Sequence, residues 1–90
     1  MPTVFIPDLL RPFSGGRARV TVTGRTLRQV FDQLDRECPG IKGQLVVEDE
    51  IRPGLAIVVD NELAAEGLLQ PVAEDTEVHI LPAMAGGSLA

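Results

Sequence analysis

The chain has 90 residues, which is the size of one small domain. An apolar content of 44% with charges of both signs is typical of a folded globular protein and excludes a disordered polar chain. The net charge is −5, and three Phe are present without any Trp or Tyr, so the composition argues against a nucleic-acid-binding protein.

The charges are unevenly distributed along the chain. Residues 1–42 carry seven basic and four acidic side chains, whereas residues 43–90 carry one basic and nine acidic side chains. An acidic half repels nucleic-acid phosphates and suits docking onto a basic protein surface. The alternative is a solubilising face without a specific partner.

Features related to cellular location favour the cytoplasm. The N-terminal stretch MPTVFIPDLL has neither the basic start nor the long apolar run of a signal peptide or membrane span. Cys38 is the only cysteine, so an internal disulfide is impossible and a reducing compartment is natural. We therefore expect a cytoplasmic protein with no membrane partner.

The first 24 residues predict a β-hairpin. Residues 3–7 are rich in β-favouring side chains, and residues 8–18, which contain Pro12 and Gly15–Gly16, are expected to form a loop. Residues 18–24 alternate, with Val20 and Val22 on one face, which predicts a half-buried strand. Gly15–Gly16 tolerates the positive φ that a hairpin loop requires.

Residues 26–38 carry the clearest helix pattern. Thr26 is a suitable N-cap and Gln29 follows three residues later, which is a capping-box pattern, and Pro39–Gly40 ends the helix. Cys38 lies on the apolar stripe, and no basic residue or helix N-terminus is placed to activate its thiol, so we expect a buried core cysteine. The stripe consists of Leu27, Val30, Phe31, Leu34 and Cys38.

The second half predicts several short strands. Residues 44–50 predict a short strand that leads into a loop, and residues 52–54 predict a turn. Residues 55–61 begin with a continuous apolar run, which predicts a strand covered on both faces, and Asp60–Asn61 is expected to turn the chain. Residues 62–76 predict a short strand or a helical turn.

The last predicted strand, residues 77–82, alternates with Val78 and Ile80 on one face. His79, the only histidine, lies on the other face, where no second His or Cys could complete a metal site. We therefore expect an ordinary exposed histidine and no metal site. Leu81 shares the face of His79, either as a docking contact or packed under a neighbouring loop.

The order of hairpin, long helix, further strands and final strand predicts an α+β fold. A β-grasp satisfies this order, with a mixed sheet of four to five strands and one main helix packed on one face. A ferredoxin-like or another small α+β fold is also compatible. The predicted domain spans residues 1–82, and residues 83–90 are expected to form a flexible C-terminal tail.

The sequence lacks the motifs of an independent enzyme. No Walker loop, dinucleotide fingerprint, zinc cluster or Ser-His-Asp set occurs, so we expect a binding or carrier module that is not an enzyme. The uncharged tail AMAGGSLA can bring a terminal carboxylate to the active site of a partner enzyme, because two glycines without Cβ atoms can thread a narrow channel. A carboxylate delivered in this way needs activation by ATP. The alternative is a frayed tail.

Four stretches of the chain resemble the MoaD/ThiS family of ubiquitin-like sulfur carriers. The resemblance covers residues 3–87, and the family fold is a β-grasp, in agreement with the predicted order of elements. Within the family the chain is most similar to the carriers of thiocarboxylate-dependent cysteine biosynthesis. The stretches are IPDLLRPFSGG, TGRTLRQVFDQLDRECPGI, IVVDNE and EDTEVHILPAMAGG.

The resemblance implies a reaction at the carboxylate of Gly87. An E1-like adenylating and sulfurtransferase enzyme activates this carboxylate with ATP, and sulfur transfer then makes a thiocarboxylate, with no cofactor bound by the carrier itself. In the cysteine pathway a PLP-dependent synthase accepts the sulfur and a JAMM-type zinc protease releases the cysteine. Gly86 precedes the reacting residue. Partner docking is expected at Leu81, Pro82, Ala83, Met84 and Ala85.

The resemblance leaves the sulfur acceptor open. Related carriers serve molybdopterin, thiamin or secondary metabolites, and a protein modifier or plain interaction domain with the same fold is a further alternative. Family members end at the second glycine, whereas Ser88, Leu89 and Ala90 follow Gly87 here. Proteolytic removal of these three residues is therefore expected before activation, with the JAMM-type protease as the candidate.

Overall fold

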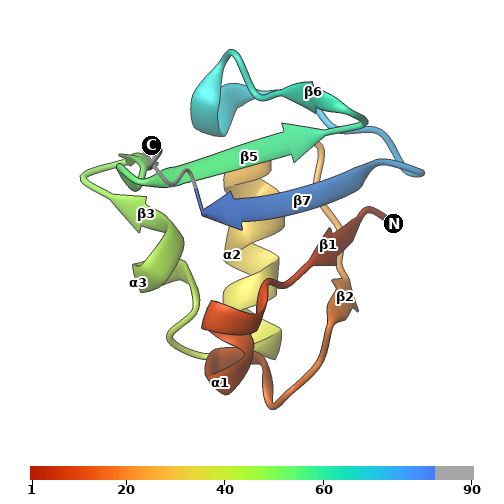
Figure 1. Ribbon diagram of the computed structural model, residues 1–90. Coiled ribbons are helices and arrows are strands. Elements are labelled where there is room, and N and C mark those ends of the chain that lie inside the picture. Colours follow the sequence, from red (N-terminus) through yellow and green to blue (C-terminus); the bar gives the residue numbers. More distant parts are fainter. Residues whose placement is uncertain (83–90) are drawn as a thin grey trace.

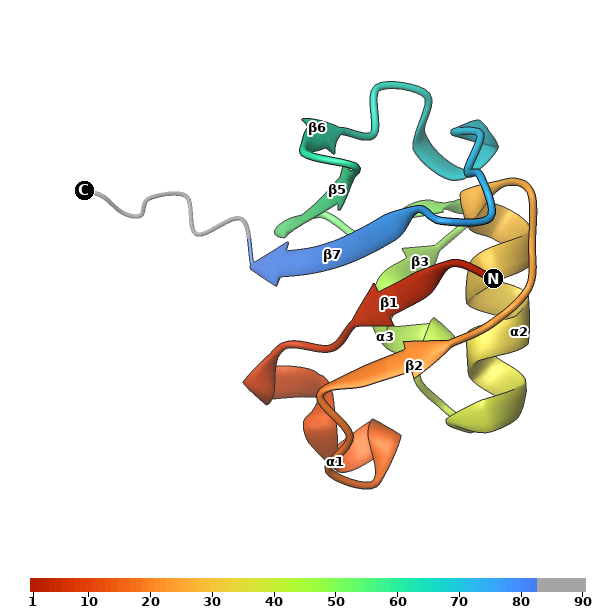
Figure 2. The ribbon, with the colours of Figure 1, turned by 90° about the vertical axis from the view of Figure 1, so that its right-hand side faces the viewer.

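A five-stranded sheet and one long helix form the two layers of the fold (Figure 1). The computed structural model describes residues 1–82, and the predicted tail 83–90 lies outside the described residues. The strand order is β2-β1-β7-β5-β6, and Figure 2 shows helix α2 along one face of this sheet. The bounds are β1 Thr3–Phe5, β2 Arg19–Thr21, α2 Leu27–Glu37, β5 Leu55–Val59, β6 Glu62–Leu63 and β7 Glu77–Pro82.

The final strand lies in the centre of the sheet, beside the first strand. β7 pairs in parallel with β1, where Val4 is opposite Val78, and antiparallel with β5, where Ile57 is opposite Ile80. β1 and β2 form the predicted antiparallel hairpin. This topology confirms the predicted β-grasp and excludes the ferredoxin-like alternative.

The connection between β1 and β2 is more ordered than the predicted loop. A 3₁₀ turn, η1 Asp8–Leu10, leads into one helical turn, α1 Arg11–Ser14. Pro12 stands in the first turn of α1, where its missing N–H costs no hydrogen bond, so this breaker is compatible with a helix start. Gly15 and Gly16 have φ of 69° and 86°, which confirms their predicted positive φ.

Helix α2 begins and ends close to the predicted residues. Thr26 Oγ1 accepts a hydrogen bond from the backbone N–H of Gln29 at 3.3 Å. In return Gln29 Oε1 accepts one from the N–H of Arg25 at 2.8 Å, one residue earlier than in the usual capping box. The whole predicted stripe is buried against the inner face of the sheet. That inner face contributes Val4, Val20, Ile57, Val78 and Ile80 to the same core.

The segment between α2 and β5 differs from the prediction of one short strand. A helical turn, α3 Lys42–Leu45, precedes a hairpin of β3 Val46–Val47 and β4 Glu50–Ile51. Glu48 and Asp49 connect these strands with positive φ of 51° and 63°, as a tight hairpin turn requires. Residues 62–76 contain both predicted alternatives, strand β6 and a 3₁₀ turn, η2 Gly67–Leu69.

The prediction that β5 is covered on both faces is wrong. Ile57 and Val59 are buried on the α2 side, whereas Ala56 and Val58 are only half-buried on the other side. Since α2 packs on one face, the continuous apolar run of β5 places apolar side chains on the outer face of the sheet as well. Exposed apolar side chains on a sheet face are typical of a binding surface, so this outer face is a candidate site for a partner.

Candidate functional site

An apolar row crosses the outer face of the sheet, on the side away from α2. The strand register places Phe5 of β1 opposite His79 of β7. It also places Val58 of β5 between His79 and Leu63 of β6. Opposed residues on neighbouring strands point to the same face, so Phe5, His79, Val58 and Leu63 form one continuous surface, called here the outer-face row. Leu63 is 68% exposed, which makes the row accessible to a partner.

His79 lies in this apolar row rather than on a polar, fully exposed face. Its ring stacks on Phe5 with the centroids 4.3 Å apart and an angle of 3° between the ring planes. Its Nε2 lies 3.5 Å from Glu77 Oε1. The side chain is 36% exposed, so the prediction of an ordinary exposed histidine is corrected to a half-buried, stacked one. The pattern missed Phe5 as a partner because β1 and β7 lie far apart in the sequence.

The end of β7 brings the chain to the point where the predicted tail begins. Leu81 pairs opposite Ala56 and Pro82 opposite Leu55, so the register with β5 continues to the last described residue. Leu81 is 45% exposed, which contradicts the alternative that it packs under a neighbouring loop, and its role as a docking contact stays a prediction. Pairing with β1 ends at His79, so the last residues of β7 are held in the sheet by β5 alone, and this pairing fixes the position of Pro82.

The residues predicted to carry the chemistry lie outside the described part of the chain. They are Ala83, Met84, Ala85, Gly86, Gly87, Ser88, Leu89 and Ala90. The structure therefore positions the base of the predicted tail, at Leu81 and Pro82, and the surface around it.

Cys38 is 1% exposed, which confirms the predicted core position. The expectation that no basic residue approaches its thiol is wrong, because Arg17 Nη2 lies 3.4 Å from Cys38 Sγ. The same Arg17 nitrogen donates to the backbone carbonyl of Glu37 at 3.1 Å, and Arg17 Nε donates to that of Ser14 at 3.1 Å. The guanidinium thus joins the β1–β2 connection to the end of α2, a contact that spans 21 residues.

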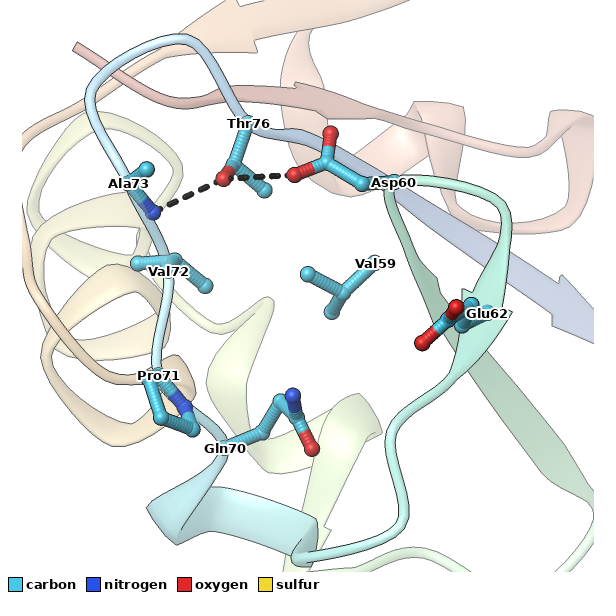
Figure 3. Close-up of a pocket in the computed structure, with 8 residues that line it drawn as sticks. All are labelled: Val59, Asp60, Glu62, Gln70, Pro71, Val72, Ala73 and Thr76. Carbon is cyan, nitrogen blue, oxygen red and sulfur yellow. Dashed lines mark hydrogen bonds between the residues drawn. The ribbon is translucent and has the colours of Figure 1, made fainter.

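A hollow of about 430 Å³ lies between the turn after β5 and the segment before β7 (Figure 3). Thr76 Oγ1 donates to Asp60 Oδ2 at 2.9 Å and accepts from the N–H of Ala73 at 2.8 Å. Asp60 Oδ1 also accepts from the N–H of Glu77 at 3.0 Å. These polar groups satisfy one another and hold the start of β7, which favours a structural role for them.

Two further observations limit the chemistry of residues 1–82. In this part of the chain no three His, Cys, Asp or Glu side chains gather as a metal site would require. The helices that lie between residues 1 and 82 are too short or too polar for any of them to cross a bilayer.

Comparison with known proteins agrees with the fold and identifies the family. The ThiS family profile matches residues 4–87, from β1 to the second glycine of the predicted tail. Sulfur carrier protein CysO of Mycobacterium tuberculosis is 38% identical over 92 residues, which cover 94% of this chain and 97% of the relative.

Solved structures give the same result. A chain from the crystal structure of the BexX/CysO complex of Amycolatopsis orientalis matches with a TM-score of 0.91 at 34% identity, covering 97% of this chain and 100% of that chain. SAMP1 from Haloferax volcanii matches with a TM-score of 0.72 at 25% identity, covering 96% and 98% of the two chains. With a family match from β1 through β7 and a relative of this identity over nearly the full length, the chain belongs to the ThiS family.

Proposed function

We propose that this protein is a sulfur carrier that acts in the biosynthesis of cysteine or of another sulfur-containing metabolite. The observation that carries the proposal is the match of the ThiS family over residues 4–87, which ends at Gly87. The strand that leads to this glycine is the central strand β7. The similarity to CysO proteins, both in sequence and in structure, supports the cysteine-biosynthesis branch.

The proposed reaction proceeds in two steps at the C-terminus of Gly87. An oxygen of the Gly87 carboxylate attacks the α-phosphorus of ATP, which releases pyrophosphate and leaves an acyl-adenylate. Hydrosulfide then attacks the acyl carbon and displaces AMP, which carries away one of the former carboxylate oxygens, so that sulfur takes the place of this oxygen. An E1-like adenylating and sulfurtransferase enzyme supplies ATP and catalysis, and the carrier itself binds no cofactor.

The described residues supply position rather than catalysis. β7 pairs with β1 as far as His79 and with β5 as far as Pro82, so in this proposal Ala83, Met84 and Ala85 connect the sheet to Gly86 and Gly87. The exposed Leu81 and the outer-face row provide an apolar surface at which a partner can dock. Cys38 is buried and has no part in the proposed reaction.

The thiocarboxylate sulfur serves as the nucleophile for a second enzyme. In the cysteine branch this is a PLP-dependent cysteine synthase, and a JAMM-type zinc protease then releases the product from Gly87. All of these partners act in the cytoplasm. Since adenylation needs a free carboxylate on Gly87, Ser88, Leu89 and Ala90 must first be removed, and the same type of protease is the proposed processing enzyme.

The test uses a form of the protein that ends at Gly87. This form is incubated with ATP, a sulfur donor and a ThiS-family adenylating enzyme, and its intact mass is measured. We expect a mass increase equal to the exchange of one oxygen for sulfur. The 1–90 form is the control and should keep its mass. A Gly87-terminated form that gains no sulfur contradicts the proposal.

A second candidate function is a ubiquitin-like protein modifier. The similarity to SAMP1 from Haloferax volcanii favours this alternative. In that case the activated Gly87 carbonyl would be attacked by a lysine amine, which gives an isopeptide bond and releases AMP. Conjugates detected by tryptic mass spectrometry of host lysates would support the modifier, and a terminal thiocarboxylate without conjugates would support the carrier.

A further inference from the structure

A second apolar surface lies beside the end of β7 and is separate from the outer-face row. It is a pocket of about 390 Å³ between η1 and α1 on one side and the turn before β5 on the other. Leu9, Leu10 and Phe13 form the first wall, and Arg52, Pro53 and Leu55 form the second. It is called here the tail-exit pocket, because Leu55 is also the residue opposite Pro82, where the described part of the chain ends.

The tail-exit pocket is open to solvent, and its walls are mainly apolar, with Gln44 and Arg52 as the polar side chains that line it. Leu9 is 72% exposed and Phe13 is 37% exposed, whereas Leu10 is only 4% exposed and belongs to the core. The pocket thus has a base fixed by the fold and a rim of large apolar side chains. Exposed apolar side chains around a concavity are typical of a place where another side chain is buried on binding.

The charge at the tail-exit pocket differs from that of the rest of the molecule. Arg52 is the only charged residue that lines it, although the chain has a net charge of −5. Arg52 Nη1 donates to the backbone carbonyl of Gly43 at 3.1 Å, which holds the guanidinium at α3. No ion pair joins Arg52 to a carboxylate within residues 1–82. The pocket is therefore complementary to an apolar side chain that has a carboxylate next to it.

We propose that the tail-exit pocket binds an apolar side chain flanked by an Asp or Glu on the adenylating enzyme that receives the tail. This inference rests on the proposed function. The active site that accepts Gly87 must have an entrance close to Pro82, and the pocket begins at the residue paired with Pro82. Contacts there fix the carrier's orientation at this entrance, so the tail enters in one direction. The pocket therefore determines affinity, while the chemical step takes place at Gly87.

The main test exchanges Leu9 for Asp and uses Leu69 as a matched control. The two leucines lie in the 3₁₀ turns η1 and η2 and are 72% and 67% exposed, but Leu69 is not part of the tail-exit pocket. In adenylation assays with the Gly87-terminated form, Leu9→Asp should raise the KM for the carrier about tenfold with little change in kcat. Leu69→Asp should leave the KM within about twofold.

A charge test addresses Arg52 independently. Arg52→Glu should raise the KM about tenfold and Arg52→Lys less, since lysine keeps the charge but loses the planar guanidinium. Arg25→Glu is the control, because it makes the same change in net charge at an exposed position outside this pocket. Equal effects of Arg52→Glu and Arg25→Glu would show that only the net charge matters and would overturn the proposal. Far-UV circular dichroism checks that all variants are folded.

Two other occupants of the tail-exit pocket, the chain's own C-terminal extension and a second copy of the chain, would give different experimental results. The 1–90 form is not adenylated, so occupation of the pocket by Leu89 of the chain's own extension is tested by urea denaturation: a loss of stability from Leu9→Asp that appears in the 1–90 form but not in the Gly87-terminated form, which lacks Leu89, would assign the pocket to this extension. A wild-type dimer that Leu9→Asp dissociates in sedimentation equilibrium would assign it to a second copy. Either result overturns the proposal. If the wild type forms thiocarboxylate and Leu9→Asp behaves like Leu69→Asp, the pocket inference fails alone. If the wild type is never adenylated, the proposed function fails with it.

Discussion

At the scale of single residues, Arg17 from the β1–β2 connection binds the C-terminal end of α2. Its guanidinium contacts the Glu37 carbonyl, which lies in the last turn of the helix, and the sulfur of Cys38. Carbonyls at a helix end have no partner within the helix, so a cation there is favourable. Cys38 is enclosed by this contact and by the core, which explains a buried cysteine without any catalytic role.

Replacement of Cys38 tests this structural role. Cys38→Ala leaves a small cavity and should lower the free energy of unfolding by about 1 kcal/mol, as measured by urea denaturation. The yield of thiocarboxylate from the Gly87-terminated variant should equal that of the wild type. A folded Cys38→Ala protein that no longer accepts sulfur would show that the thiol takes part in the reaction.

Arg17 itself is expected to contribute to stability through its hydrogen bonds. Arg17→Ala removes the donors to the Ser14 and Glu37 carbonyls and should cost about 1 kcal/mol in urea denaturation. The 3.8 Å pair with Glu37 adds little, because both side chains are about half exposed. Arg19→Ala, at an exposed position in β2, is the control and should change stability by less than about 0.5 kcal/mol. Equal losses for both variants would contradict the role of Arg17.

At the scale of elements, the junction between β2 and α2 depends on Gly24. Its φ is 151°, and a Cβ atom there would lie 2.8 Å from the backbone nitrogen of Val30 and 2.9 Å from Val30 Cγ2. The chain must pass this close to the first turn of α2 because Val20 and Val22 of the hairpin and Val30 of the helix belong to one core. A glycine is therefore required between strand and helix.

Gly24→Ala should destabilise the fold by about 2 kcal/mol or more, since the new methyl group meets backbone atoms that cannot move freely. Gly43→Ala is the matched control, because a Cβ at Gly43 has nothing within 4 Å and Gly43 lies in α3. Thermal unfolding of the two variants gives the comparison. A Gly24→Ala protein as stable as Gly43→Ala would contradict the tight junction.

At the scale of the whole molecule, the two ends of β7 have different roles in the β-grasp: the start holds the strand in place, and the end leads to the predicted tail. β7 is central in the sheet, so its start is pinned by Asp60 and Thr76 while its end reaches the surface at Leu81 and Pro82. Two apolar surfaces lie near that end, the outer-face row and the tail-exit pocket. A partner that holds both would fix the orientation of the carrier without touching its core.

Processing of the C-terminus is tested on the protein as it is made in its own host. We expect the intact mass of the functional protein to correspond to a chain that ends at Gly87, because only a free Gly87 carboxylate can be adenylated. Inhibition or deletion of the host's JAMM-type protease should leave Ser88, Leu89 and Ala90 in place. Functional protein that always retains residues after Gly87 would contradict this expectation.

Local patterns in the sequence were sufficient for the main elements and the inner face of the sheet. The capping pair Thr26 and Gln29, the helical stripe and the alternation of β2 and β7 each depend on neighbours within a few residues, so periodicity alone predicts them. The order of these elements was compatible with the β-grasp but also with a ferredoxin-like fold, and the family resemblance favoured the β-grasp. The family resemblance added the role of Gly87, which periodicity does not contain.

Only the tertiary structure decided which surfaces surround the predicted tail. The stacking of Phe5 on His79, the contact of Arg17 with Cys38 and the pocket between Leu9 and Leu55 all join segments that are distant in the sequence. The one-sided cover of β5 is also a tertiary property, because an apolar run has the same sequence whether one or two layers pack on it. The sequence thus predicted the main elements and the proposed reacting terminus, and the packing of the elements determined which apolar surfaces are exposed beside the end of β7.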